Sequence, residues 1–362
     1  MKNLDVLVVY SSKLAISAAV SDLKSKFPFN PNSKTAGYNL PYSYFLQACK
    51  KFGMSAGFST SSDVIGPGAC QTFWTTQAGE WKKVRQEAHS SHIFDKISPS
   101  SPKRVAERKL LLSTKKVRSF NHQELHSMFF DKLLTYTRLP QYSLPTVTIN
   151  DASISAIKSA IQNLQTLIKQ HPHAEDFKKA FVLKDRFGAS GNHVYAVETN
   201  FVLQIQKLMN ENPSVQFILQ PFLHFDKGFS YNGIRTTTDV RLIFHHNKIV
   251  QSYIRLAQGD DFRCNEHQGG ELIYVTKRDI PSSILKRAKI IVSRINRPHS
   301  LYALDFIVSN SGNAYLLEGN FGPGLDWDLK KKINEKMSKN LIDSIVDEFA
   351  NRIKNEGSLV RN

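Results

Sequence analysis

The segment LYALDFIVSNSGNAYLLEGN, residues 301–320, contains two apolar runs on either side of a cluster of turn-forming residues. This pattern is typical of a β-hairpin. If the turn centres on Ser311 and Gly312, Asp305 lies directly opposite Glu318. Glu318 and Asn320 are two positions apart on one strand and therefore project from the same face.

Two carboxylates that face each other in an apolar hairpin destabilise it. A divalent cation removes this penalty, and magnesium takes oxygen ligands of this kind together with substrate phosphates. The hairpin therefore suggests a magnesium site at Asp305, Glu318 and Asn320. In the alternative interpretation, one carboxylate pairs with an arginine or a lysine and the other lies at a solvated strand end.

A second segment, residues 181–195, places Lys184 inside an apolar strand pattern. A buried ammonium group is costly unless it meets an anion. Gly188 and Gly191 follow in a loop whose backbone N–H groups could bind an anion. Because no Gly-Lys-Ser/Thr follows and the chain re-enters a strand, this is not a Walker A loop. The pattern suggests two strands with a tip that lies over phosphates, and an ordinary hairpin turn is the alternative.

A third segment, Ile218-Leu-Gln220-Pro221-Phe-Leu223, is an apolar strand pattern that we expect to stop at the proline. Such a hinge could present the Pro221 carbonyl and the Leu223 N–H to the edge of an adenine ring. Read in isolation, the segment indicates only the end of a strand.

Arginines enter two successive apolar strand patterns, as Asp239-Val-Arg241 and Tyr253-Ile-Arg255. The segment Asp261-Phe-Arg-Cys-Asn-Glu-His-Gln-Gly-Gly270 follows them. Arginines in an apolar sheet suggest recognition of a carboxylate or a phosphate. Structural ion pairing with nearby acids is the alternative.

The global composition indicates a soluble globular protein. The chain has 362 residues, of which 41% are hydrophobic and 22% charged, so its length favours two or three domains at roughly 150 residues each. We find no apolar run long enough for a membrane span and no signal-peptide pattern. Three widely spaced cysteines suit a reducing cytosol and argue against a disulfide framework or a zinc site, so we expect a cytoplasmic protein.

The formal charge of +17 is the unusual global property. Residues 1–150 carry 20 Lys and Arg against 9 Asp and Glu, an excess of 11, and the remaining residues carry an excess of 6. A basic surface attracts anions in general, including nucleic acid, acidic peptides and phosphorylated metabolites. A contribution to solubility without a specific partner explains the charge equally well.

Short strand and helix patterns alternate from Leu144 onward, which predicts an α/β or α+β fold class. Clear examples are a helix at Ile154–Gln170, a helix at Pro281–Arg294 and strands at Asp239–His245 and Lys248–Ala257. We place the first domain boundary between Pro102 and Asn121. His245 and His246 most simply cap a strand end before a turn.

Taken in order, these elements resemble the ATP-grasp superfamily, and in particular its carboxylate–amine ligases of the ribosomal-protein glutamate ligase and glutathione synthetase type. Six features occur in family order over about residues 120–325: Asp131-Lys132, Lys184 with its glycine loop, the Gln220 hinge, Asp239-x-Arg241, Arg255 with Phe262-Arg263-x-Asn265-x-x-x-Gly269-Gly270, and Asp305 with Glu318-x-Asn320. The resemblance implies an ATP-grasp fold with a pre-ATP-grasp α/β domain at residues 1–120. Residues 121–222 and 223–362 would be the two ATP-clamping subdomains.

The resemblance also implies roles for individual residues. Lys132 and Lys184 would contact nucleotide phosphates, Ser190 and Gly191 would close over the terminal phosphates, and Gln220, Pro221 and Leu223 would frame adenine. Asp305, Glu318 and Asn320 would hold one or two magnesium ions, for which manganese could substitute. Arg255 and Asn265, with Arg241, would act at the transferred phosphoryl group and the acceptor.

The reaction implied by the resemblance is ATP-dependent formation of an amide through an acylphosphate, with a carboxylate substrate and an amine acceptor, an amino acid or a peptide. Two departures from the family pattern matter: a proline follows Gln220, and the stretch His224–Thr238 looks longer than in compact relatives. The ribose-binding acid is therefore open, with Asp226 as a candidate.

Two other functions are compatible with the same scaffold. One is a kinase acting on a polyanionic hydroxyl substrate such as an inositol phosphate, and the other is a non-catalytic nucleotide-binding module. We expect neither membrane association nor a nucleic-acid partner. A homodimer is compatible with the resemblance, because dimers are common among similar ligases.

Overall fold

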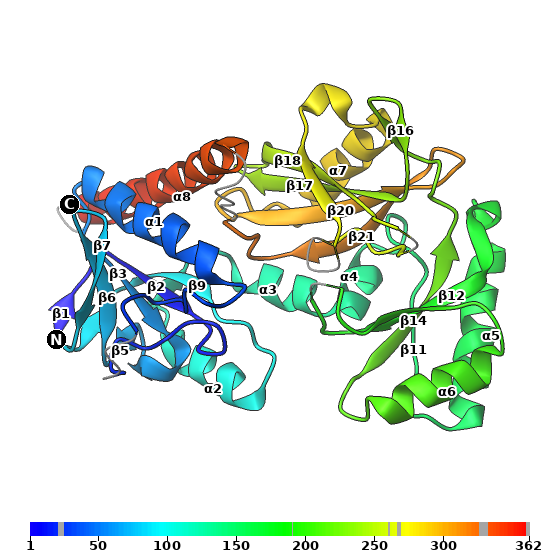
Figure 1. The fold of residues 1–362 in the computed structure, drawn as a ribbon, viewed down its shortest axis with the longest axis horizontal. Coiled ribbons are helices and arrows are strands. Elements are labelled where there is room, and N and C mark those ends of the chain that lie inside the picture. The colour runs from blue at the N-terminus through cyan, green and yellow to red at the C-terminus, as the bar shows by residue number, and fades with distance from the viewer. Residues whose placement is uncertain (21–24, 190, 260, 266–268, 326–331, 360–362) are drawn as a thin grey trace. The chain divides into compact units, whose positions relative to one another are not determined.

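The computed structural model describes residues 1–362 except 21–24, 190, 260, 266–268, 326–331 and 360–362 (Figure 1). The chain forms two compact units. Unit 1 consists of Met1–Gln123, His299–Leu301 and Gly322–Asn362, and unit 2 consists of Glu124–Pro298 and Tyr302–Phe321. Both units combine sheets with helices, which confirms the predicted α/β (α+β) class.

This division differs from the predicted boundaries at the C-terminal end of the chain. We had expected Gly322–Asn362 to belong with residues 223–321, but this segment is part of unit 1. The physical reason is a set of aromatic contacts made by helix α8 (Lys332–Leu359). The centroid of the Phe349 ring lies 4.9 Å from the ring centroid of Phe120. It lies 6.5 Å from that of Phe45 on helix α1 (Asn39–Lys51).

A six-stranded sheet in the order β10-β9-β2-β3-β6-β7 forms the centre of unit 1. Four of these six strands, β10, β9, β2 and β3, run parallel to one another. All five residues of β2 are buried, which explains why this strand is a continuous apolar run without alternation. The strand bounds are β2 Val6–Tyr10, β3 Ala56–Thr60, β6 Phe73–Gln77, β7 Glu80–Val84, β9 His92–Lys96 and β10 Arg118–Ser119.

A smaller sheet and three α-helices complete unit 1. The small sheet has the order β1-β8-β5-β4, and helices α1 and α8 lie side by side (Figure 1). The remaining bounds are β1 Lys2–Asn3, β4 Val64–Gly66, β5 Ala69–Cys70, β8 Ala88–His89 and α2 Pro102–Leu111, with 3-10 helices at Ala36–Tyr38 and Ser61–Asp63.

Unit 2 contains a four-stranded sheet in the order β11-β14-β12-β13, which we call the β14 sheet. Helices α5 and α6 cover one face of it (Figure 1). The core between them consists of alternate strand residues such as Phe181 and Leu183 packed against Ile157 and Leu164 of α5. The bounds are β11 Val147–Thr148, β12 Phe177–Asp185, β13 Val194–Val197, β14 Phe217–Leu223, α5 Ile154–Gln170 and α6 Phe201–Glu211, with a 3-10 helix at Ala174–Asp176.

The second large sheet of unit 2 has the order β19-β18-β17-β20-β21, and we call it the β17 sheet. Helices α3, α4 and α7 belong to the same unit, and the buried residues Leu125 of α3 and Ile284 of α7 share one core with Leu242 and Leu304 of the sheet. The bounds are α3 Gln123–Phe130, α4 Lys132–Arg138, β17 Thr238–His245, β18 Lys248–Leu256, β19 Glu271–Tyr274, α7 Ser282–Ile295, β20 Tyr302–Val308 and β21 Ala314–Asn320, with a 3-10 helix at Lys277–Asp279.

The long stretch between β14 and β17 contains a short hairpin of its own. Strands β15 (Ser230–Tyr231) and β16 (Ile234–Arg235) pair with each other in a two-stranded sheet. Among the described residues, no helix has the length and the apolar character needed to cross a membrane.

The predicted hairpin at residues 301–320 is confirmed, and Asp305 is paired with Glu318. The pairing arises in an unexpected way. Val308 pairs with Ala314, which centres the turn on Ser311, and a bulge between the Asp305 and Phe306 pairs then shifts the register by one residue.

The prediction that the strand ends before Pro221 is wrong, because β14 runs from Phe217 to Leu223. Pro221 pairs with Phe181 next to an irregularity in the β12–β14 register. On the other side, β11 pairs only with Ile218 and Leu219. Pro221 therefore lies where one edge of β14 is uncovered, and a proline is tolerated at such a position.

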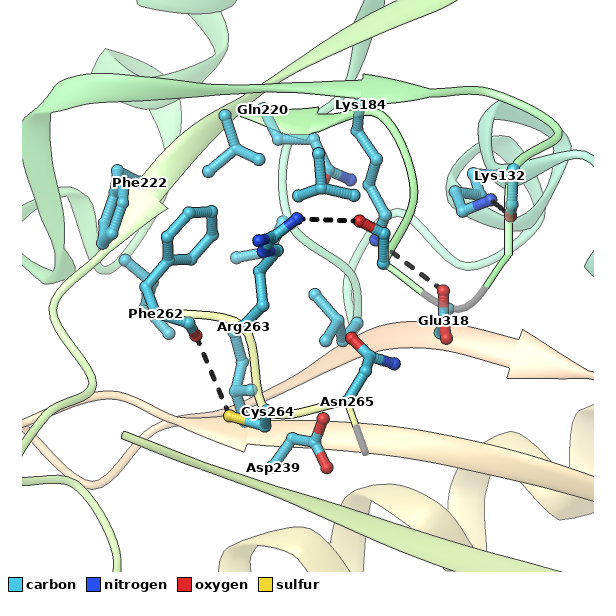
Figure 2. Close-up of a pocket in the computed structure, with 18 of the residues that line it drawn as sticks. Lys132, Lys184, Gln220, Phe222, Asp239, Phe262, Arg263, Cys264, Asn265 and Glu318 are labelled. Atoms are coloured by element: carbon cyan, nitrogen blue, oxygen red, sulfur yellow. Dashed lines mark hydrogen bonds and ion pairs between the residues drawn. The ribbon is translucent and has the colours of Figure 1, made fainter. Parts of the chain in front are cut away.

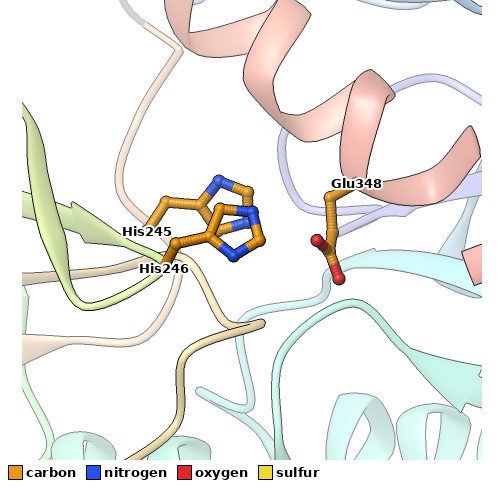
Figure 3. Close-up of side chains that lie close together, drawn as sticks. All are labelled: His245, His246 and Glu348. Atoms are coloured by element: carbon orange, nitrogen blue, oxygen red, sulfur yellow. The ribbon is translucent and has the colours of Figure 1, made fainter. Parts of the chain in front are cut away.

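The interpretation of His245 and His246 as the end of a strand is confirmed. Strand β17 ends at His245, which pairs with Lys248, and the two turn residues His246 and Asn247 have φ of 51° and 58°. Two consecutive positive φ values define a tight hairpin turn. The two imidazole rings lie 4.0 Å apart between centroids (Figure 3), whereas Glu348, also labelled there, belongs to unit 1.

Candidate functional site

A pocket in unit 2 lies between the β14 sheet and the β17 sheet (Figure 2). Strands β12, β13 and β14 contribute residues from one side, and β17, β18, β20 and β21 contribute from the other. The polar and charged residues that line it are Lys132, Lys184, Asp185, Asn192, Gln220, Asp239, Arg255, Arg263, Asn265 and Glu318. Its lining is therefore polar in part, with groups of both charges.

One part of the pocket lining is apolar and aromatic. Phe222 of β14 and Phe262, in the loop after β18, lie 5.2 Å apart between ring centroids and contribute to the wall with Leu223. Gln220 is buried and donates a hydrogen bond from Nε2 to the Thr146 hydroxyl at 2.9 Å. Pro221 and Leu223, which lie beyond the part of β14 that pairs with β11, also line the pocket here.

Two buried lysines mark another part of the pocket. Lys184 and Lys132 are 7% and 8% exposed, although burying an ammonium group is costly without an anion. The nearest carboxylate oxygen to Lys184 Nζ belongs to Glu318, at 3.8 Å. Burial lowers the pKa of Lys132 to about 8, although the charge of Glu318 opposes the shift. These lysines therefore suit a strongly anionic ligand.

The loop between β12 and β13, residues 186–193, borders the lysines, and we call it the glycine loop. Its backbone is held from two sides. Lys132 Nζ donates to the Gly188 carbonyl, and Arg263 donates to the Gly191 carbonyl at 3.3 Å. Gly191 has φ of 72°, which favours glycine at this position. Ser190, predicted to contact terminal phosphates, lies outside the described residues.

The arginines of β17 and β18 form a buried ion-pair network with two aspartates. Arg255 makes two hydrogen bonds to Asp239, at 2.7 and 2.9 Å, and a third to Asp305 at 2.8 Å. Arg241 makes two to Asp305, at 2.7 and 2.6 Å. Burial alone would raise the pKa of Asp305, but the two guanidinium groups lower it to about 2.

This network alters the interpretation of the arginines as groups that face substrate. Arg241 does not line the pocket; it holds Asp305 and donates to the Tyr253 hydroxyl at 3.2 Å. Arg255 does line the pocket, but its guanidinium is already engaged by Asp239 and Asp305. The alternative of structural ion pairing therefore describes both arginines in this structure.

The oxygen ligands predicted for magnesium are close together. Glu318 lines the pocket with its side chain 19% exposed, and Asn320 Nδ2 lies 3.4 Å from Asp305 Oδ2. A carboxylate offers about four acceptor positions. Asp305 accepts three hydrogen bonds from guanidinium groups, one at Oδ1 and two at Oδ2. Oδ1 therefore retains a free acceptor position. The donor set therefore fits a hard cation next to Glu318.

Most of the predicted site residues meet in this one pocket. The residues that line it are Lys132, Lys184, Gly191, Gln220, Pro221, Leu223, Arg255, Asn265 and Glu318. Asp305, Asn320 and Arg241 lie behind Glu318 and Arg255 in the β17 sheet and do not line it themselves. Asp226 does not line it either: it accepts a hydrogen bond from Asn310 at 3.0 Å and borders a neighbouring cavity. Asp185, Phe222 and Cys264 also line the pocket and were not predicted as site residues, although all three lie within or next to the quoted motifs.

The family is shown by comparison with protein-family models. Residues 136–345 match the RimK-like ATP-grasp domain. The chain therefore belongs to the RimK-like ATP-grasp family, as the ordered motifs predicted. Comparison with curated protein sequences gives no match.

Solved structures of ATP-grasp ligases share the fold along nearly the whole chain. The D-cycloserine synthetase DcsG is 13% identical, with a TM-score of 0.59, and the alignment covers 96% of this chain and 99% of that one. D-alanyl-alanine synthetase A from Vibrio cholerae is 13% identical, with a TM-score of 0.58, and the alignment covers 96% of this chain and 98% of that one. The macrocyclase MdnC from Microcystis aeruginosa, bound with the precursor peptide MdnA, is 12% identical, with a TM-score of 0.53, and the alignment covers 94% of this chain and 99% of that one. Identities this low indicate the fold alone.

Proposed function

We propose that this protein is an ATP- and magnesium-dependent carboxylate–amine ligase that acts through an acylphosphate. The observation that supports this most strongly is the pocket itself. Two buried lysines, Lys132 and Lys184, line a cavity that also has an aromatic wall, and the ammonium group of Lys184 lies 3.8 Å from the Glu318 carboxylate. A nucleoside triphosphate has the matching parts, a planar base and a polyanionic tail.

In this proposal, Gln220, Pro221 and Leu223 frame the adenine, and Lys132 and Lys184 bind the phosphates together with the backbone of the glycine loop. Asp305, Glu318 and Asn320 hold one or two magnesium ions, for which manganese could substitute. A bound divalent cation would neutralise charge on the β- and γ-phosphates. Arg241 acts indirectly, because it fixes Asp305 through two hydrogen bonds.

The chemistry proceeds in two balanced steps. A carboxylate oxygen of the substrate attacks the γ-phosphorus, the bond to the β–γ bridging oxygen breaks, and ADP leaves. The nitrogen of an amine then attacks the acyl carbon, the acyl–oxygen bond breaks and inorganic phosphate leaves, and the nitrogen loses a proton to give an amide. The chain contributes by positioning and by electrostatic stabilisation. In this proposal Arg255 and Asn265, which both line the pocket, act at the transferred group, and the Arg255 guanidinium does so while it is held by Asp239 and Asp305.

For the substrates we propose an amino acid or a peptide, with an anionic character that suits the basic residues 1–150. Fold relatives include a D-alanyl-alanine synthetase and a macrocyclase bound with a precursor peptide, so the scaffold accommodates both sizes of substrate. We propose a cytoplasmic location, and a homodimer is a further hypothesis.

The test is to incubate the protein with ATP, magnesium and pooled amino acids or acidic peptides, and to measure ADP, phosphate and product masses. A ligase releases ADP and phosphate in equal amounts and yields a product with the mass of two partners less one water. A kinase gives ADP and a phosphorylated product without free phosphate, and this outcome would refute the proposal. The charge of +17 is the one observation that favours a polyphosphorylated kinase substrate.

The third function, a non-catalytic nucleotide-binding module, predicts tight ATP binding without turnover in any pool. The acidic residue Glu318 argues against it, because a module that only binds nucleotide could lose this carboxylate. The variant Glu318→Gln serves as the negative control in every assay of turnover.

A further inference from the structure

The beginning of the glycine loop is tied to the start of helix α4 by a bidentate ion pair. Arg186 donates to the two carboxylate oxygens of Asp131, from Nε at 2.8 Å and from a terminal nitrogen at 2.6 Å. The two side chains are 26% and 16% exposed, so water screens this pair only partly. The Lys132 N–H also donates to the Arg186 carbonyl at 3.2 Å. Two adjacent residues therefore contact the loop, Asp131 through its side chain and Lys132 through its backbone.

An aromatic contact strengthens the same connection. The ring of Phe187 stacks on that of Phe130 at the end of α3, with centroids 5.2 Å apart and planes 26° from parallel. The Arg186 guanidinium lies 5.0 Å from the centre of the Phe187 ring. Phe130, Asp131, Arg186 and Phe187 thus form one continuous cluster at the start of the loop.

This cluster determines where two groups of the pocket lie. Lys132 follows Asp131 directly and donates to the carbonyl of Gly188, and Lys184 precedes Arg186 by two residues on β12. A shift of the loop would therefore move the ammonium groups and the backbone that we assign to the phosphates. The adenine region, formed by Gln220 and Leu223, lies further along β14, four and seven residues beyond Gln216, whose carbonyl accepts from the Arg186 N–H at 2.8 Å. We therefore expect a shift of the loop to affect the lysines more than the adenine region.

We propose that Asp131 and Arg186, supported by the Phe130–Phe187 stack, are positioning residues that fix the glycine loop over the terminal phosphates of the nucleotide. The proposal rests on the proposed function for the identity of the ligand. According to this proposal, Asp131 and Arg186 increase the affinity of the pocket for the triphosphate part of the nucleotide and not for its nucleoside part.

The sequence of α4 offers a variant that separates this role from helix stability. Asp131 also caps α4, because its Oδ1 accepts from the Leu133 N–H at 3.0 Å and from the Leu134 N–H at 3.3 Å. Asparagine is as good a cap as aspartate. Asp131→Asn therefore keeps the cap and removes the charge, and Arg186→Gln removes the charge from the other side. Glu124→Gln is the matched control, since it breaks the Glu124–Arg297 pair, which does not border the pocket.

The experiment measures binding of the non-hydrolysable analogue AMPPNP and of AMP, each with magnesium, by isothermal titration calorimetry. We expect Asp131→Asn and Arg186→Gln to weaken AMPPNP binding about fivefold, the order expected for loss of one partly exposed ion pair. AMP binding should change by less than about twofold. Arg186→Lys keeps the charge but not the bidentate geometry, so its loss of AMPPNP affinity should lie between zero and that of Arg186→Gln. Amide hydrogen exchange in the glycine loop should rise in Asp131→Asn and stay unchanged in Glu124→Gln.

Two results would overturn the proposal. One is AMPPNP affinity in Asp131→Asn equal to that of the wild type. The other is an equal loss for AMP and AMPPNP, which would indicate a general structural role. Failure of the wild-type protein to bind AMPPNP at all would instead refute the nucleotide site itself, so the two failures are distinguishable.

Discussion

Asp305 and Glu318 are paired across one hairpin, yet the structure predicts a large loss of stability when Asp305 loses its charge and almost none when Glu318 does. Asp305 is fully buried and accepts three hydrogen bonds from Arg241 and Arg255, at 2.6–2.8 Å. Glu318 is 19% exposed, and its nearest cationic groups lie at 3.8 and 3.9 Å. The substitutions to compare are Asp305→Asn and Glu318→Gln.

Asp305→Asn leaves Arg241 buried without its closest counter-charge, and breaking a buried pair in this way costs about 3–5 kcal/mol. In a unit of this size each kcal/mol lowers the transition temperature by roughly 2–4 °C, so we expect a decrease of roughly 6–20 °C. The long contacts of Glu318 contribute only about 0–1 kcal/mol. Glu318→Gln should therefore melt within about 4 °C of the wild type.

The assay is thermal unfolding followed by circular dichroism, with ADP release measured on the same samples. Transition temperatures are compared rather than free energies, because a chain of two units need not unfold in a single step. Both variants should lose turnover, but only Asp305→Asn should lose stability. An Asp305→Asn protein that melts with the wild type would refute the assignment of Asp305 as the centre of the buried network.

Three further predictions concern single residues of unit 2. Because burial lowers the pKa of Lys132 to about 8, its positive charge is lost as the pH rises through that value; AMPPNP affinity should fall between about pH 7 and pH 9, and Lys132→Met should bind weakly without this pH step. Gly319 lies against Phe129, whose ring would be 2.1 Å from an added Cβ, so Gly319→Ala should destabilise unit 2 by about 1–3 kcal/mol in thermal unfolding; an unchanged melting temperature would contradict the packing. Phe262→Ala removes the aromatic partner of Phe222 and should weaken binding of AMP and AMPPNP equally, in contrast to the loop variants; a selective loss for AMPPNP would exclude a role in binding the base.

The order of elements in unit 2 could be predicted from sequence because each element has a strong local pattern. Helix α5 has the predicted bounds, Ile154–Gln170, since its apolar residues recur at helical spacing and Ser153 caps it. The pairing of Asp305 with Glu318 was also predicted, but with the wrong turn centre. The turn is centred on Ser311, and the bulge next to Asp305 then shifts the register so that Asp305 still pairs with Glu318. Neither feature leaves a clear signal in the sequence.

What could not be predicted depends on contacts between strands that are distant in sequence. The partners of Arg241 follow from the register of β17 with β20, which sets it opposite Asp305. The continuation of β14 through Pro221 depends on how short β11 is. The place of Asp226, outside the pocket, is set by its contact with Asn310 in the β20–β21 turn. Local patterns carry none of this information.

The packing of Gly322–Asn362 in unit 1 is a failure of the same kind. An amphipathic pattern indicates that a helix has an apolar side, but it does not say which sheet that side meets. The contacts of Phe349 with Phe45 and Phe120, each far away in the chain, decide the question.

The central claim, transfer of phosphate from ATP to a carboxylate, can be tested most directly by trapping the intermediate with hydroxylamine. The protein is incubated with ATP, magnesium, pooled acidic peptides and hydroxylamine, and hydroxamates are measured by mass spectrometry. We predict hydroxamate formation that requires ATP and magnesium, matches ADP release, and is lost in Glu318→Gln. ADP release with a phosphorylated product that is stable to hydroxylamine, and without hydroxamate, would contradict the claim.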